Sequence, residues 1–284
     1  MVLVMFYISV ALSVLIIVTT ITTLIIHCRR SSGPSKYGML FALSLTYLLY
    51  GVLTCLWSFP WLLPNEIYMN ILTLDFRITL LNGFVPLISQ ITVSISSALL
   101  ALDRVAIMAL PMRYSSMNIS VKLSICGSLI NIGFILFFLV ISLTHEYFNM
   151  DFQNTIHSMD RTLTYYVLPI ALLIEILLYF VFAIQFRMYS TNPRNGLSRK
   201  QTAQTNQIVF FQMICHTLLC VIPNGLRSVQ FIGVPMKWYN RIDNYTGVMF
   251  SVSVLLSSLF TLYKLRPKLK EVIVVSTATF SAKK

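Results

Sequence analysis

Seven long apolar stretches alternate with short polar connections along the chain. Six of them contain no Asp, Glu, Lys or Arg, and these are residues 1–28, 37–65, 78–102, 123–145, 201–226 and 244–263. The seventh, residues 162–186, contains one charge, Glu175. An α-helix needs about 20 apolar residues to cross a hydrocarbon core of roughly 30 Å, whereas a membrane strand needs only about 10 alternating residues. Each stretch is therefore predicted to be a membrane-spanning helix.

The pattern predicts an all-α membrane protein, a seven-transmembrane helix bundle in which residues 1–284 form one membrane domain. The predicted spans are about 2–26, 39–63, 79–102, 123–143, 162–186, 207–226 and 244–263. Residues 264–284 are predicted to be a tail after the last span. Composition supports this class, because 57% of the residues are hydrophobic and only 11% are charged. A soluble domain usually carries about 25% charged residues to cover its surface.

The distribution of Lys and Arg predicts the orientation of the bundle. Sixteen of the 21 lie in the first, third and fifth connections and in the tail. The positive-inside rule places these segments in the cytoplasm, so the N-terminus is expected outside and the C-terminus inside. The net charge of +12 then reflects the orientation of the chain in the membrane. Nucleic-acid binding is not expected, because the basic residues lie in short segments between apolar runs rather than on one folded face.

No metal, cofactor or catalytic centre is expected. The five cysteines lie in predicted spans or on the predicted cytoplasmic side, and their spacing does not match a CxxC…CxxC zinc site. The patterns HExxH and GxSxG, which mark metalloprotease and serine-hydrolase sites, are absent from the chain. We therefore do not expect an enzyme.

Two polar residues near the middle of neighbouring spans are candidates for a polar core or a ligand pocket. Glu175 and His216 each lie about ten residues from a predicted helix end, so they could meet at the same depth. A charge at mid-span costs about 2.5–3.5 kcal/mol on insertion scales, which calls for a specific role. One interpretation is that the two side chains share a proton or a hydrogen bond in a ligand-binding or switching core. The other is that each is satisfied separately.

Three prolines and one polar helix side complete the candidates within the membrane. Pro86, Pro169 and Pro223 lie in the third, fifth and sixth spans, where each makes a helix kink possible. Proline is also common in membrane helices without such a role. Asn82 and Gln90 belong to the polar side of the third span and are candidates for ligand contact, with helix packing as the alternative.

The third span ends in the stretch LDRVAIMALPMRY, residues 102–114. Arg104 suits the negative C-terminal end of a helix, but Asp103 is repelled there. Asp103 is therefore better explained as a partner for Arg104, and such a pair can be held while buried and broken by water or a new partner. A simple charged stop would explain Arg104 and leave Asp103, Pro111 and Tyr114 without a role.

This stretch resembles the DRYxAxxxPxxY stretch of rhodopsin-like G-protein-coupled receptors, and it lies at the same inner end of the third of seven spans. Cys220 to Pro223, CVIP, resembles the CWxP of span six without its Trp, and Pro169 resembles the span-five proline. The compact chain and the DRV…PMRY text are most similar to nematode serpentine chemoreceptors, class BC among them.

The chain also departs from the superfamily pattern. Thr46 and Tyr47 stand near the place of the span-two Asp, and Tyr263 in span seven is not preceded by Asn-Pro. Span one lacks the usual Asn, span four lacks Trp, and the disulfide between span three and the second outer loop is missing. These departures suggest a diverged chemosensory branch.

The resemblance implies a plasma-membrane receptor of a sensory cell that binds an extracellular small molecule and signals to a heterotrimeric G protein. It implies that Asp103, Arg104, Pro111 and Tyr114 form the G-protein switch. The cytoplasmic basic rim around this switch is expected to comprise Arg113, Arg194, Arg199 and Lys200. The alternative is a small-molecule or ion transporter or channel, for which Glu175 and His216 would be the intramembrane charges.

Overall fold

The computed structural model consists of helices, and no strand occurs in the part that it describes. The described residues are 2–29, 38–58, 76–110, 114, 117–144, 163–191, 199–229 and 239–265. Seven helices in these segments are long and apolar enough to cross a membrane. The predicted number of spans and the all-α class are therefore confirmed.

The helices follow the predicted spans in order. Their bounds are α1 (Val2–Arg29), α2 (Gly38–Ser58), α4 (Phe76–Ala109), α6 (Ile119–Thr144), α8 (Leu168–Thr191), α9 (Arg199–His216), α10 (Ile222–Val229) and α11 (Tyr239–Leu265). Two wider π-helical turns, η3 (Leu163–Val167) and η4 (Thr217–Val221), precede α8 and connect α9 to α10. The sixth span is thus built from α9, η4 and α10 together.

Two helices extend well beyond the predicted spans. Helix α4 continues through Asp103 and Arg104 to Ala109, although the predicted span ends at residue 102. Helix α9 begins at Arg199, ahead of the predicted start at residue 207. The physical reason is the same in both cases. A charge limits how far a segment can enter lipid, but it does not prevent the backbone from continuing its helical hydrogen bonds.

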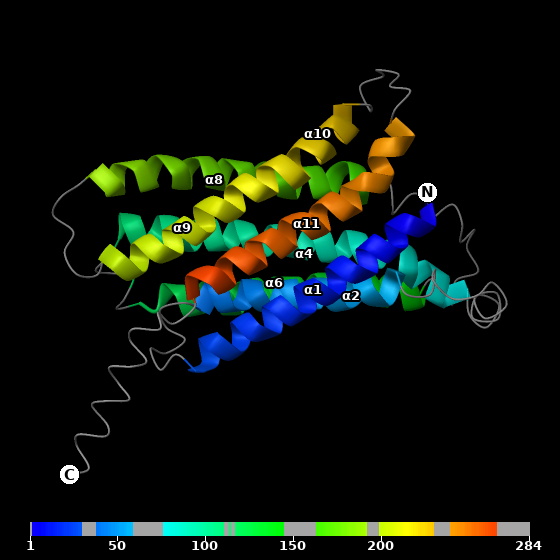
Figure 1. Cartoon of the computed structure of the whole chain (residues 1–284), viewed down its shortest axis with the longest axis horizontal. Coiled ribbons are helices and arrows are strands. Elements are labelled where there is room, and N and C mark those ends of the chain that lie inside the picture. Colours follow the sequence, from blue (N-terminus) through cyan, green and yellow to red (C-terminus); the bar gives the residue numbers. More distant parts are fainter. Residues whose placement is uncertain are drawn as a thin grey trace, which may run out of the picture.

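The helices run along the long axis of the bundle, and α1 begins at the end opposite to the one where α11 finishes (Figure 1). Helix α4 contacts α2, α6, α8 and α9, while α11 contacts α1, α9 and η4. In the apolar window of α4, 61% of the residues are buried, compared with 17% in that of α6. Helix α4 is therefore the central helix, and α6 packs at the periphery.

Hydroxyl and amide groups connect the central helix to its neighbours. The Oγ of Ser96 on α4 lies 3.0 Å from Oγ1 of Thr46 on α2, and it accepts a 2.8 Å hydrogen bond from Nδ2 of Asn131 on α6. One turn further along α2, the Tyr50 hydroxyl lies 2.8 Å from Ser251 Oγ of α11. Such groups prefer protein partners because lipid provides none.

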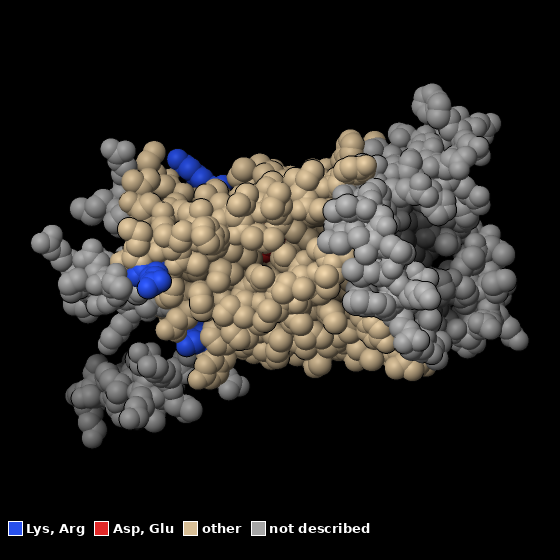
Figure 2. Space-filling view, turned by 90° about the horizontal axis from the view of Figure 1, so that it is seen from above, with Lys and Arg blue, Asp and Glu red and all other residues tan. Residues whose placement is uncertain are grey.

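The outer surface of the bundle is apolar, as lipid contact requires. Large side chains such as Leu56, Leu129 and Phe180 are 64%, 64% and 65% exposed. Most of the described face in Figure 2 is uncharged, and Lys and Arg appear only toward one end. The Lys and Arg side chains that the structure describes are Arg29, Arg104, Lys122, Arg187 and Lys264. Because successive spans alternate in direction, all of these lie at the same end.

Both of the described proline sites adjoin a π-helical turn. Pro169 and Pro223 each lie two residues after the last residue of a π-helical turn, Pro169 after η3 and Pro223 after η4. Proline has no backbone N–H to donate to the residue four places earlier, so the helix can widen there. At the end of η4, the N–H of Ile222 donates to the carbonyl of Thr217, five residues back. Pro86 lies within α4, and its side chain is outside the described residues.

Two glycines of α6 provide a test of this packing. A Cβ added at Gly127 would lie 2.6 Å from Cδ1 of Leu99 on α4, whereas a Cβ at Gly133 would meet nothing within 4 Å. We expect Gly127→Leu to destabilise the purified chain by about 1–3 kcal/mol relative to Gly133→Leu, because only the first overpacks a helix contact. Thermal unfolding of both variants in detergent measures the difference. Equal stabilities would contradict the α4–α6 packing.

Candidate functional site

A charged pair is buried near the end of the central helix. Asp103 is 0% exposed and Arg104 is 1% exposed. The Nε of Arg104 donates to Oδ2 of Asp103 at 3.0 Å, and Nη2 donates to the same oxygen. Adjacent residues on a helix point about 100° apart, so the long Arg104 side chain must fold back to reach its neighbour. The structure thus places Arg104 against Asp103.

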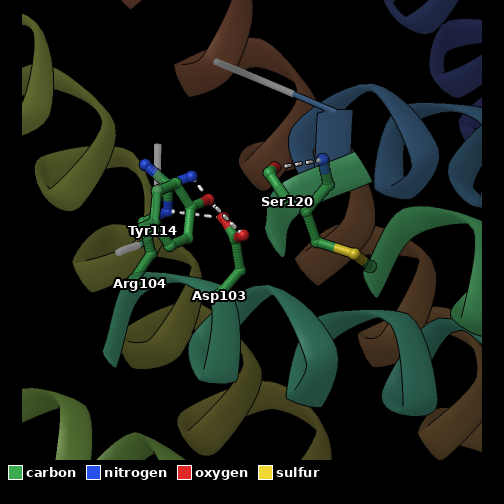
Figure 3. Close-up of polar contacts among 5 residues, drawn as sticks. Asp103, Arg104, Tyr114 and Ser120 are labelled. Carbon is green, nitrogen blue, oxygen red and sulfur yellow. Dashed lines mark hydrogen bonds and ion pairs between the residues drawn. The ribbon is translucent and has the colours of Figure 1, made fainter. Parts of the chain in front are cut away.

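A third side chain completes this cluster from beyond the end of α4. The Tyr114 hydroxyl donates to Oδ1 of Asp103 at 2.5 Å, and both Arg104 and Tyr114 point toward the carboxylate (Figure 3). A straight helix would place residue 114 about 16 Å beyond residue 103. The Tyr114 side chain therefore lies closer to Asp103 than a straight continuation of α4 would place it. We call Asp103, Arg104 and Tyr114 the inner cluster.

The two carboxylate oxygens of Asp103 have different partners, Tyr114 on Oδ1 and Arg104 on Oδ2. If Arg104 moved to a new partner, Asp103 would keep one hydrogen bond rather than become an isolated buried charge. This lowers the cost of separating the pair. Burial, together with the negative charge of Asp103, raises the pKa of the Tyr114 phenol. The phenol therefore remains a donor throughout the physiological pH range.

Contacts between neighbouring helices adjoin the inner cluster. Ser120 at the start of α6 accepts a 3.3 Å hydrogen bond from the backbone N–H of Met39, in the first turn of α2 (Figure 3). This satisfies one of the N–H groups that a helix start leaves without a partner. At the same end of the bundle, Nδ2 of Asn206 on α9 donates to Sδ of Met108 on α4 at 3.5 Å.

Helix α9 is also fastened to α11 at this end. Lys264 donates from Nζ to Oε1 of Gln207 at 2.9 Å, and its carbonyl oxygen accepts from Nε2 of Gln204. The ammonium group lies 5.4 Å from the ring centre of Phe260. The described length of α9 contains no acidic residue, so no carboxylate on α9 pairs with Arg104. Side-chain amides of α9 contact α4 and α11 here instead.

A second polar site lies in the middle of the bundle. His216 Nδ1 of α9 lies 3.0 Å from Oε1 of Glu175 on α8, so the structure brings these two sequence candidates together. Glu175 is 0% exposed and His216 is 5% exposed. The Tyr179 hydroxyl, one turn further along α8, donates to the same Oε1 at 2.6 Å. We call Glu175, Tyr179 and His216 the middle cluster.

Further polar groups adjoin the middle cluster. The Ser94 hydroxyl of α4 lies beside the Glu175 carboxyl group but makes no hydrogen bond of normal geometry. Tyr47 of α2 is within hydrogen-bonding reach of Ser97 on α4 and Ser257 on α11. The His216 ring meets the Phe250 ring edge-on, with centroids 5.5 Å apart. Five helices therefore contribute to one polar interior.

Most of the remaining candidates have side chains that lie outside the described residues. Gln90 is half-buried on α4, while Asn82 lies on α4 with a side chain outside the described residues. Pro111, Arg113 and Arg194 lie outside the described residues altogether. Arg199 and Lys200 form the first turn of α9, but their side chains are not described.

Some contributing residues were not singled out from the sequence. Tyr179 stands four residues after Glu175, the spacing that places two side chains on one helix face, so it could have been found. Lys264, Gln204 and Gln207 had no such signal, because their contacts join distant parts of the chain. Tyr263 is 68% exposed, so it lies outside the polar interior.

The described residues contain no group of three or more His, Cys, Asp or Glu side chains that could hold a metal ion. All five cysteines are free. The sequence matches no model of a known protein family and no curated protein.

Tyr114→Phe tests the inner cluster. The variant leaves Oδ1 of Asp103 without its donor, so we expect a loss of about 1–3 kcal/mol in unfolding free energy. Tyr263→Phe, which changes an exposed phenol at the same end, is the matched control and should lose little. A stability of Tyr114→Phe equal to that of the control would contradict the contact.

The same pair of variants predicts a pH dependence. An unfolded tyrosine has a pKa of about 10, and burial raises that of Tyr114. The stability contributed by Tyr114 is therefore fully present below about pH 10 and lost as the pH rises above it. Denaturant unfolding between pH 7 and 11 measures the difference in unfolding free energy between wild type and Tyr114→Phe. This difference should stay constant up to about pH 10 and shrink at higher pH. A gap that grows above pH 10 would refute the assignment.

Proposed function

We propose that this protein is a chemosensory G-protein-coupled receptor of the rhodopsin-like type, most similar to nematode serpentine chemoreceptors. It would reside in the plasma membrane of a sensory cell and pass the binding of an extracellular small molecule to a heterotrimeric G protein. The observation that carries the proposal is the inner cluster. A buried Asp–Arg pair, held by a tyrosine from beyond the helix end, lies at one end of the central helix of a seven-helix bundle.

The orientation follows from the basic side chains. Those that the structure describes share one end of the bundle with the inner cluster. Under the positive-inside rule this end is cytoplasmic, with the N-terminus outside and the C-terminus inside. An epitope at the C-terminus should then be stained only after permeabilisation of expressing cells, and one at the N-terminus without it. Staining in the reverse pattern would contradict the orientation.

The mechanism is a shift between two packings of the bundle. A ligand in the outer half shifts the balance only by its different affinity for the two packings. In the closed packing, α9 is held to α4 through Asn206 and to α11 through Lys264. In the open packing α9 moves away, Arg104 leaves Asp103, and its guanidinium group contacts the G protein. Arg113, Arg194, Arg199 and Lys200 form the basic rim of that contact.

Arg104→Ala tests this function. We expect surface expression to stay within about twofold of wild type and ligand-evoked or basal G-protein signalling to fall at least tenfold, because no other described cation of α4 can take its place. Arg29→Ala is the control and should signal normally. It removes an exposed charge from the end of α1, at the same end of the bundle as Arg104. Cyclic-nucleotide and calcium reporters measure both.

A second variant separates signalling from folding. Arg104→Ala leaves Asp103 buried with only Tyr114 as a partner, so a variant without either charge is the control for folding. Asp103→Asn/Arg104→Ala removes both charges and should express well but still not signal. Full signalling by either variant would refute the proposed switch.

A transporter or channel is the alternative function, and the middle cluster is the observation that favours it. Glu175 and His216 lie opposite each other at mid-bundle, where ionisable residues often mark ion pathways. The discriminating experiment applies candidate odorants to expressing cells with and without G-protein block. Responses abolished by the block support the receptor, and currents or uptake that survive it support the transporter.

A further inference from the structure

The middle cluster has an uneven distribution of hydrogen bonds. Oε1 of Glu175 has two polar neighbours, the Tyr179 hydroxyl at 2.6 Å and His216 Nδ1 at 3.0 Å. Oε2 has no partner among the described residues, although the unpartnered hydroxyl of Ser94 lies beside the carboxyl group. Oε1 is therefore the acceptor oxygen, and Oε2 is the free position at which a proton can be carried.

His216 shows a matching asymmetry. Its Nε2 is buried and has no partner among the described residues. A protonated imidazole carries N–H donors on both nitrogens, so a charged His216 would leave one charged donor without an acceptor. A neutral ring with its hydrogen on Nδ1 donates to Oε1 of Glu175 and leaves only a lone pair unused. The geometry thus favours neutral His216.

The surroundings offer no compensation for a negative charge on Glu175. The titratable groups that face it are Tyr47 from α2, Tyr179 from α8 and Cys220 from η4. None of these is cationic. Helix α4 contributes Ser94, and α11 contributes the Phe250 ring against His216. A buried ion pair is stable only when its remaining polar atoms are hydrogen-bonded, and Oε2 and Nε2 are not.

We propose that Glu175 and His216 form a proton-binding site that holds α8 against α9. In the closed packing Glu175 is a carboxylic acid with its proton on Oε2, directed toward Ser94, and neutral His216 donates from Nδ1 to Oε1. When α9 separates from α8, water reaches the carboxyl group and the proton leaves to solvent. The bound ligand of this site is one proton, and closing the bundle takes it up.

The test uses infrared spectroscopy on the purified full chain in lipid nanodiscs at pH 7, so it requires no signalling. The difference spectrum between wild type and Glu175→Gln should contain a carboxylic-acid C=O band that shifts in deuterium oxide. Ser94→Ala should keep this band and move it to higher frequency, because Oε2–H loses its neighbouring acceptor. Asp103→Asn is the control and should leave it unchanged.

Nitrogen-15 magnetic resonance of labelled histidine provides the second readout. Wild type at pH 7 should show one neutral Nδ1–H ring that is absent in His216→Phe. Carboxylate bands in place of the C=O band, an imidazolium signal, or a band unaffected by Ser94→Ala would each overturn the proposal. The proposed receptor function can fail without changing these spectra, and the spectra can contradict the site while signalling stays normal.

Discussion

Lipid cannot form hydrogen bonds, and this constraint determines how the polar residues of the bundle are arranged. Every buried donor or acceptor must find a partner within the protein, or remain at considerable cost. Helix α4 meets this requirement on several sides at once. Its Ser96 connects α2 and α6, its Asp103 binds Arg104 and Tyr114, and its Ser94 lies beside Glu175 of α8. The central position of α4 follows from this polar side, because the other helices pack to cover it.

The contacts of α9 divide into two levels. At the end that holds the inner cluster, Asn206 joins α9 to α4 through a hydrogen bond between neutral groups. Lys264 joins α9 to α11 through a hydrogen bond in which only the lysine is charged. At the middle, His216 joins it to α8 through Glu175. The π-helical turn η4 follows immediately after His216, so the helix is wider where its inner half would move relative to its outer half. Each of these contacts is a single hydrogen bond or ion pair, which suits the proposed movement of α9 between two packings.

Several features could be predicted from the sequence because they depend on local composition. Stretches of some twenty residues with almost no charge were sufficient to predict the seven spans. Glu175 and His216 lie at similar depths in their spans, which was sufficient to predict that they approach each other. Helices α4 and α9 continue past the predicted spans, because charge limits membrane entry rather than helix length. The contact of Tyr114 with Asp103 depends on the tertiary position of a residue beyond the end of α4, and the Lys264 contacts depend on α9 lying beside α11. Neither has a periodic signal. The role of Arg104 remains a prediction.

The central claim is that the buried charges of α4 are stabilised by one another. A double-mutant cycle on the purified chain measures this directly, with unfolding free energies of wild type, Asp103→Asn, Arg104→Gln and the double variant. Each single variant leaves an unpaired buried charge, whereas the double variant leaves none. We predict a coupling energy of at least about 1.5 kcal/mol, with the double variant no less stable than either single variant. Additive losses, with a coupling energy near zero, would contradict the account.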